Sequence, residues 1–401
     1  MSKLNSKLTT MNWKEAKYIE NNLYELPGHW LKIEYFEALN ILFRVENLLR
    51  MFVYIILKNE YGEKWKDLSV TSDDDENSTI GAIAKKRLSQ DKDYAYLGYV
   101  ITSPLLHLTS GELIRIIVSD TYWKYFKKYF PGSRDIIKNK LDEIGNVRNS
   151  LAHFRPLKKG DIELVKQNAN HTLSVIEQTI KDFMDCPDIV PTNTDEDWYK
   201  ELTLLKHQEI QLNYKQSKNE EFIKFLIDFE PPKLSEEDGF LGYTVRTLNL
   251  KTDNLLLNYP NLTKYVISCT ERIPYGYTIT PKSNKIIKQI TLTISRNTLK
   301  GNYVKIKSEL EKILLEVTNE IDLIKEDNLA RGKLVEVVRC HYEKVEKYHS
   351  LKSTLFRTEL TEQTPVEYWG NLNYISKDFT TDTDKYPWMP VDVSEDKKSL
   401  F

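Results

Sequence analysis

The feature that most constrains the fold of this chain is an unbroken apolar segment near its beginning. From Leu31 to Lys58 the sequence contains no Gly or Pro, so nothing in this stretch interrupts a helix. Its apolar residues cover more than one stripe at the helical period, which predicts a helix that is buried on most of its sides. Such a helix belongs inside a bundle or against a second subunit.

The rest of the first half adds further helical segments. Apolar residues recur at helical spacing in Ser110–Val118, Asp135–Asn149 and Ile162–Asp182, and Ser110 is a candidate N-cap. No alternation typical of strands interrupts these segments. Residues 20–185 are therefore predicted to form an all-α helical bundle.

The second half differs in character. Residues 186–197 contain the prolines and polar side chains typical of a linker, and residues 198–401 follow as a second domain. Two of its segments alternate and are rich in β-branched residues, which predicts strands, while three others have helical spacing. The chain is thus expected to be α+β overall, with the all-α bundle first. The expected strands are Tyr243–Leu250 and Ile286–Ile294, and the expected helices are Asp197–Asp228, Val304–Ile324 and Lys333–His349.

Charge is balanced over the whole chain but not along it. The 57 Lys and Arg against 59 Asp and Glu give a formal charge of −2, which excludes nucleic-acid binding through a uniformly basic surface. Residues 115–171 carry 12 basic and 6 acidic side chains, whereas residues 186–240 carry 6 and 13. Both stretches could be ordinary solvated faces. Alternatively, the first forms a basic groove suited to phosphates and the second restrains access to it.

Cysteines and apolar runs indicate the compartment. Cys186, Cys269 and Cys340 lie far apart and suggest neither a disulfide framework nor a zinc ribbon. The longest apolar run, Met51–Leu57, is too short to cross a membrane, and the first residues lack a signal-peptide core. We therefore expect a reduced, soluble, cytoplasmic protein without a membrane partner. No P-loop, dinucleotide fingerprint or HExxH motif occurs, so neither a metal nor a nucleotide cofactor is expected.

Three side chains able to act on a phosphodiester stand together at the end of the predicted helix 135–149. Arg148, Asn149 and His153 form the sequence Arg-Asn-x-x-x-His. At ~100° per residue Asn149 and His153 share a face, and a long Arg can reach over the helix end. A guanidinium suits non-bridging phosphate oxygens, and an imidazole can exchange a proton near neutral pH. Alternatively, the two cations simply cap the C-terminal end of the helix, where the dipole favours positive charge.

The motif and its setting resemble the HEPN superfamily. The motif follows a Leu/Ile-rich helix, residues 135–144, and precedes a long helix. The segment Phe43–Leu57 is similar to the long early helix of the larger HEPN domains found in abortive-infection and related defence proteins. The resemblance covers residues 20–185 and implies a helical bundle that commonly dimerises, with two such motifs across a shared cleft.

The resemblance also implies an activity. Many HEPN domains are metal-independent endoribonucleases, although some members lack the motif and only bind. Carried over to this sequence, Arg148 and His153 would be catalytic and Asn149 supporting, with RNA as substrate and a homodimer as the active form. The RNA 2′-hydroxyl would attack the adjacent phosphorus, with His153 as general base or acid and Arg148 stabilising the developing negative charge.

Weaker candidates surround the motif. Glu46, an acid within the apolar early helix, could orient Arg148 or simply pair with Arg50 one turn further on. The stretch Tyr122–Phe130 interleaves aromatic and basic side chains as single-strand binders do, but its spacing also fits aromatics in the core with lysines outside. Three basic residues could hold RNA phosphates or form an exposed charged loop: Arg155, Lys158 and Lys159.

Three functional hypotheses follow. The first is a HEPN endoribonuclease effector of bacterial anti-phage or toxin type, whose second domain responds to a phage or cellular trigger or inhibitor. The second is a non-catalytic HEPN-like module that binds RNA, a nucleotide or a protein partner as a dimerising scaffold. The third places an active site among residues 200–401, which a pocket of convergent polar groups remote from Arg148 would support.

Overall fold

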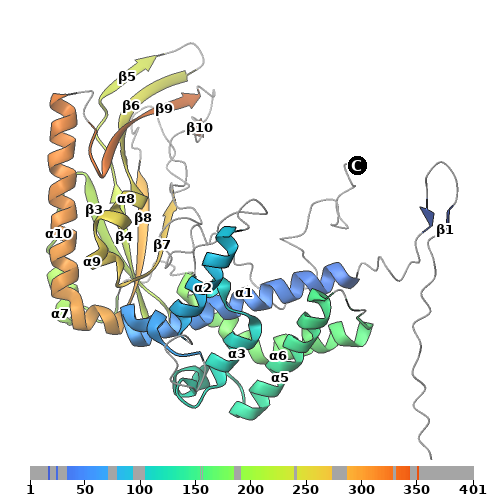
Figure 1. Cartoon of the computed structure of the whole chain (residues 1–401). Helices are drawn as coiled ribbons and strands as arrows, with labels where there is room; N and C mark the ends of the chain where they lie inside the picture. The colour runs from blue at the N-terminus through green and yellow to red at the C-terminus, as the bar shows by residue number, and fades with distance from the viewer. Residues whose placement is uncertain are drawn as a thin grey trace, which may run out of the picture.

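The structure is a computed structural model that describes residues 17–18, 24–25, 34–70, 79–93, 104–153, 155, 157–184, 191–238, 242–272, 287–327, 331–343 and 350–351. These residues form a helical part (34–184) and a sheet part (191–351). In Figure 1 the sheet part stands above the C-terminal end of the long helix α1 (Glu34–Tyr61). The expected α+β class is therefore confirmed.

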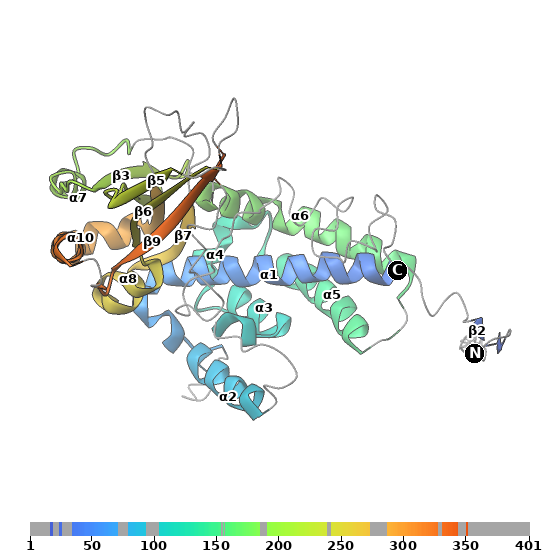
Figure 2. The same cartoon turned by 90° about the horizontal axis from the view of Figure 1, so that it is seen from above.

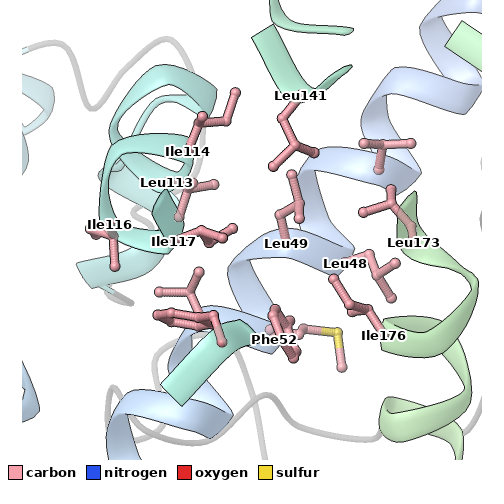
Figure 3. Close-up of a cluster of buried hydrophobic side chains, with 14 of the residues drawn as sticks. Leu48, Leu49, Phe52, Leu113, Ile114, Ile116, Ile117, Leu141, Leu173 and Ile176 are labelled. Carbon is pink, nitrogen blue, oxygen red and sulfur yellow. The ribbon is translucent and has the colours of Figure 1, made fainter. Parts of the chain in front are cut away.

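Helix α1 is the centre of the helical part. Figure 2 shows it between α6 (Lys159–Met184) on one side and α3 (Ser110–Val118) and α5 (Arg134–Ala152) on the other. Every apolar side chain of α1 from residue 45 to residue 57 is buried. In Figure 3, Leu48, Leu49 and Phe52 of α1 lie between side chains of α3, α5 and α6. The prediction of a helix buried on most sides is confirmed, because the chain's own helices surround it.

Shorter helical elements complete the helical part of the structure. Two predictions for this part need correction. Strand β2 (Tyr24–Glu25), which pairs with β1 (Lys17–Tyr18), and a bridge between Ser69 and Thr79 interrupt the predicted all-α region of residues 20–185. The N-cap of α3 is Thr109 rather than Ser110, because Thr109 and Glu112 form a capping box. The shorter helical elements are η1 (Gly62–Asp67), α2 (Ile80–Asp93), η4 (Pro104–His107), α4 (Trp123–Phe126) and η5 (Lys127–Tyr129).

The aromatic and basic stretch after α3 belongs to the core. Phe126 and Tyr129 pack against Phe52 with ring centroids 5.5 and 5.1 Å apart. The lysines of the stretch are exposed on the other side. The spacing therefore marks a core-facing segment, not an aromatic platform for single strands.

The sheet part contains two antiparallel four-stranded sheets. The first has the order β3-β4-β8-β7 and the second the order β10-β9-β6-β5. A 31-residue helix, α10 (Arg296–Glu326), shares one hydrophobic cluster with the first sheet. The strands are β3 (Ile210–Gln216), β4 (Phe222–Phe229), β5 (Ser235–Asp238), β6 (Gly242–Leu250), β7 (Val266–Arg272), β8 (Lys288–Ser295), β9 (Val335–Glu343) and β10 (Ser350–Leu351), and the short helices are α7 (Asp197–Leu202), α8 (Thr252–Asn258) and α9 (Pro260–Thr263).

Two predicted helices are wrong. The segment Asp197–Asp228 is helical only to Leu202 and then forms the hairpin β3–β4, whose turn contains Glu220 with a positive φ of 58°. The burial of the β3 side chains does not alternate strictly, and the sequence has no Gly or Pro to mark the turn that follows the strand. The segment Lys333–His349 contains the strand β9, because its valines pair with β6. Residues 344–349 of that prediction lie outside the described residues.

The other predictions for the second half are confirmed where they can be compared. The strands Tyr243–Leu250 and Ile286–Ile294 correspond to β6 and β8, and the helix Val304–Ile324 lies within α10. Residue 286 and residues 186–190 of the predicted linker lie outside the described residues.

A carboxylate fixes the connection from α10 to β9. Glu320 accepts the backbone N–H groups of Lys333 at 2.5 Å and of Leu334 and Val335 at 2.8 Å each. A β-carbon on Gly332 would overlap this carboxylate. The position therefore requires glycine for space, and the buried acid replaces the partners that these amides would otherwise lack.

A second carboxylate ties α7 to the start of α10. Glu196 accepts hydrogen bonds from Arg296 at 2.5 Å, from Lys300 at 2.8 Å and from the Trp198 indole. Burial alone would raise the pKa of Glu196, but these donors outweigh it and lower the pKa to about 2.

The helical and sheet parts meet through buried contacts. The Tyr54 hydroxyl donates to the carbonyl of Ile267 in β7 at 2.6 Å. Phe183 of α6 and Phe222 of β4 pack edge to face with centroids 4.9 Å apart. Ile267 and Phe222 belong to the hydrophobic cluster of the helical part. The two parts therefore share a core at this junction. Within the described residues, no helix combines the length and apolar character needed to span a bilayer.

Candidate functional site

The candidate site lies where the end of α5 meets the middle of α1 and the start of α3. Helix α5 forms because Ile137, Leu141, Ile144 and Val147 make a buried stripe along one side. That stripe leaves the opposite side of its last turn toward solvent. The three motif residues occupy this last turn and the position directly after it.

The helix ends in a way that places the motif at its C-terminal edge. His153 is the first residue after α5, and its backbone N–H donates to the carbonyl of Asn149 at 3.2 Å. The N–H of Arg155 then donates to the carbonyl of Ser150 at 2.8 Å. These two bonds satisfy carbonyls of the last turn. The His153 side chain is exposed and makes no hydrogen bond or ion pair with any described residue.

Glu46 connects the early helix with the motif. One carboxylate oxygen, Oε1, accepts a hydrogen bond from Arg50. The other, Oε2, accepts Arg148 Nε at 3.2 Å and the Ser110 hydroxyl. Glu46 therefore contacts both Arg50 and Arg148, because each oxygen of its carboxylate accepts a hydrogen bond from a different arginine.

The base of this site is largely shielded from solvent and held by hydrogen bonds. The side chains of Glu46 and Arg50 are 11% and 13% exposed. Arg50 also donates to Asn47 Oδ1 at 3.1 Å and to the carbonyl of Leu108 at 3.2 Å. Burial lowers the pKa of Arg50, the carboxylate of Glu46 opposes this effect, and the nearby cation Arg148 adds to it. Two guanidiniums around one carboxylate leave a net positive charge.

Arg148 is held at one edge and open at the other. Its Nε binds Glu46, its Nη1 lies 3.4 Å from Asn149 Oδ1, and its side chain is 35% exposed. No described residue accepts a hydrogen bond from Nη2. The guanidinium therefore presents terminal donors on the solvent side while its inner edge is fixed, which is how an arginine binds an anion bidentately.

The basic residues after the motif lie on the surface. Arg155 and Lys158 are exposed. The Lys158 backbone N–H donates to Asp161 Oδ2 at 2.8 Å, so an acid of α6 sits in the same turn. The side chain of Lys159, the first residue of α6, lies outside the described part of the structure.

Ser110 contributes to the site in a way that its sequence position does not indicate. Ser110 begins α3, but its hydroxyl bonds Glu46, 64 positions earlier in the chain. Nothing in local spacing signals such a contact, because it depends on how α3 packs against α1. The polar stretch of residues 71–78 and the tryptophans at positions 369 and 388 lie outside the described residues.

No group of three or more metal-binding side chains gathers within the described ranges. The comparisons with known proteins add no relative: no family model, no curated protein and no solved structure matches the chain.

Proposed function

We propose that this protein is a metal-independent endoribonuclease of HEPN type, with Arg148 and His153 as catalytic residues and Asn149 in support. The observation that carries the proposal is the setting of Arg148, whose Nε is bound by a buried carboxylate while its side chain is 35% exposed and no described residue accepts a hydrogen bond from its Nη2. A purely structural cap of the helix would not need a buried acid from another helix to orient the guanidinium.

The proposed chemistry needs only these groups and the RNA. The 2′-hydroxyl loses a proton and its oxygen bonds to the adjacent phosphorus, while the bond to the 5′-oxygen breaks and that oxygen gains a proton. The products are a 2′,3′-cyclic phosphate and a 5′-hydroxyl. His153 takes part in one of the proton transfers, and Arg148 stabilises the charge on the non-bridging oxygens.

A homodimer would supply the second imidazole. One histidine per chain does not readily serve both transfers. Leu39 and Phe43 are each 50% exposed on α1, two turns and one turn before Glu46 and on the same side of the helix. These two apolar residues beside the site support a subunit contact there, and Phe43→Glu should convert a dimer to a monomer in light scattering.

The biological setting follows from the HEPN resemblance alone. We propose an effector of bacterial anti-phage defence by abortive infection, or a toxin, acting in the cytoplasm. The sheet part would respond to a phage or cellular trigger or inhibitor. The shared core between the two parts supports mechanical coupling, since Tyr54 and Phe183 of the helical part both contact strands of the sheet part.

The test is cleavage of mixed RNA by the purified full chain in EDTA. We expect cleavage that is lost in Arg148→Ala and His153→Ala, with products ending in a cyclic phosphate. Arg134→Ala and His171→Ala are matched controls, because the first position lies at the opposite end of α5 and the second lies on α6. Equal cleavage by the motif variants and the controls would refute the site and favour a site elsewhere, including residues 200–401.

The alternative is a non-catalytic HEPN-like module that binds RNA, a nucleotide or a protein and dimerises. The exposed Arg155 and Lys158 close behind Arg148 in the chain support RNA binding in this case. If the protein is such a module and binds RNA, its affinity for RNA should fall steeply as the salt concentration rises, and no RNA should be cleaved. Expression of wild type and His153→Ala in cells separates the two, because only a nuclease makes growth inhibition depend on the imidazole.

A further inference from the structure

Helix α2 is joined to the start of α3 by an arginine and a glutamate. Arg87 of α2 donates from Nη1 to Glu112 Oε2 at 2.7 Å and from Nη2 to Glu112 Oε1 at 2.8 Å. Arg87 Nη1 also donates to the backbone carbonyl of His107. A guanidinium that binds both oxygens of one carboxylate fixes the orientation of its partner as well as the distance. Arg87 therefore holds both α3 and the chain that leads into it.

Glu112 passes this hold on to the residues before α3. Its Oε2 accepts the Thr109 N–H at 2.7 Å and the Thr109 hydroxyl at 3.0 Å. Burial alone would raise the pKa of Glu112, but the donors Arg87 and Thr109 outweigh it and lower the pKa. Thr109 and Glu112 by themselves complete the capping box, so the cap of α3 does not require a guanidinium from α2.

Residues 107–110, here called the 107–110 segment, contact the base of the candidate site. The carbonyl of Leu108 accepts Arg50 at 3.2 Å, and the Ser110 hydroxyl donates to Glu46 Oε2. The same oxygen, Glu46 Oε2, accepts Arg148 Nε at 3.2 Å. The oxygen that orients Arg148 is thus bound by the segment that Arg87 holds.

Arg87 reaches the site only through this segment. Among the described residues, no hydrogen bond or ion pair joins Arg87 directly to Glu46, Arg50 or Arg148. In the view of Figure 2, α3 lies between α2 and the length of α1. An effect of Arg87 on Arg148 must therefore pass through the 107–110 segment.

We propose that Arg87 is a positioning residue of the nuclease site. It fixes the 107–110 segment, and this segment holds Glu46 with one oxygen toward Arg148 Nε. The guanidinium of Arg148 is then oriented before RNA binds, which is the condition for stabilising charge that develops in the transition state. The catalytic consequence rests on the proposed function, but the orientation of Arg148 can be measured without cleavage.

The first measurement is hydrogen exchange at Arg148 Nε, observed by NMR in the isotope-labelled full chain and assigned with Arg148→Lys. Exchange is slow while Glu46 accepts this proton. Arg87→Met keeps an unbranched apolar stem but removes the donors, and we expect it to accelerate the exchange at least fivefold. The backbone amide of Leu141 should stay within twofold, because α5 packs through its own buried stripe.

The matched control is Arg134→Met. Arg134 also forms an ion pair, with Asp120, but it lies at the opposite end of α5 from Arg148. This variant should leave exchange at Arg148 within twofold. Unchanged exchange at Arg148 in Arg87→Met overturns the proposal, as does an equal acceleration at Leu141 or in the control, since either would show general loosening.

A second variant tests the route. Ser110→Ala removes the hydroxyl that links the 107–110 segment to Glu46. Combined with Arg87→Met, it should accelerate exchange at Arg148 by less than the product of the two single effects, because both changes act on one contact. A full product would show that Arg87 acts by another route and would overturn the proposed path.

Cleavage supplies the catalytic readout. Arg87→Met should lower kcat for RNA at least tenfold with KM within threefold, and Arg87→Lys should recover part of the loss, because an ammonium can still pair with Glu112. Unchanged kcat, or a loss confined to KM, overturns the positioning role in catalysis. If wild type cleaves no RNA while exchange at Arg148 responds as expected, the proposed function fails and the positioning of Arg148 by Arg87 is supported.

Discussion

The carboxylate of Glu46 offers the sharpest test of how the candidate site is built. Glu46→Gln keeps the shape of the side chain but removes the only negative charge between Arg50 and Arg148 among the described contacts. Loss of one partner from a buried pair costs about 3–5 kcal/mol. Because Arg148 is 35% exposed and water still solvates it, we expect a loss of about 2–3 kcal/mol in the free energy of unfolding.

A double-mutant cycle separates this charge effect from packing. In wild type, Arg148→Leu removes an attractive partner of Glu46. In the Glu46→Gln background, the same change removes a cation that only repels Arg50. The double variant should therefore lose about 1 kcal/mol less than the sum of the single losses.

The assay is urea unfolding of the full chain, followed by far-ultraviolet circular dichroism. Glu163→Gln is the matched control, because Glu163 forms an exposed pair with Lys166 on α6 at 3.5 Å and should cost at most about 0.5 kcal/mol. A Glu46→Gln variant as stable as this control, or strict additivity with Arg148→Leu, would show that Glu46 does not hold the arginines as described.

Three further predictions concern the stability of the sheet part and of its junction with the helical part. Because the pKa of Glu196 is lowered to about 2 from 4.5, its stabilisation is present above pH 4.5 and is lost as pH falls toward 2. Glu196→Gln should flatten the stability profile in that window, measured by thermal unfolding against pH. Gly332→Ala should cost about 2–3 kcal/mol in urea unfolding, because the added methyl group displaces Glu320 from the amides it accepts. Tyr54→Phe should cost about 1 kcal/mol, since the Ile267 carbonyl loses its donor, and hydrogen exchange at β7 should rise.

Parts of the candidate site could be predicted from the sequence because they depend on local spacing. Arg148, Asn149 and His153 lie at one helix end, where the helical period of ~100° per residue places Asn149 and His153 on one face. In the structure Arg148 contacts Asn149, and the His153 side chain makes no hydrogen bond with either among the described residues. Glu46 was a candidate because an acid inside an apolar helix needs a partner. The sequence could not decide between Arg50 and Arg148, since only the packing of α5 against α1 places the second arginine within reach.

The sequence by itself determined α1 and the side of α5 that is buried, because continuous apolar residues at a helical period leave a chain few other ways to bury them. Tertiary structure alone decided that residues 203–228 would not be helix, a point best seen in β3. Its residues suit a helix or a strand locally, and pairing with β4 selects the strand. The same holds for Ser110 and Glu46, because contacts between distant segments are set by the assembled core and not by neighbours along the chain.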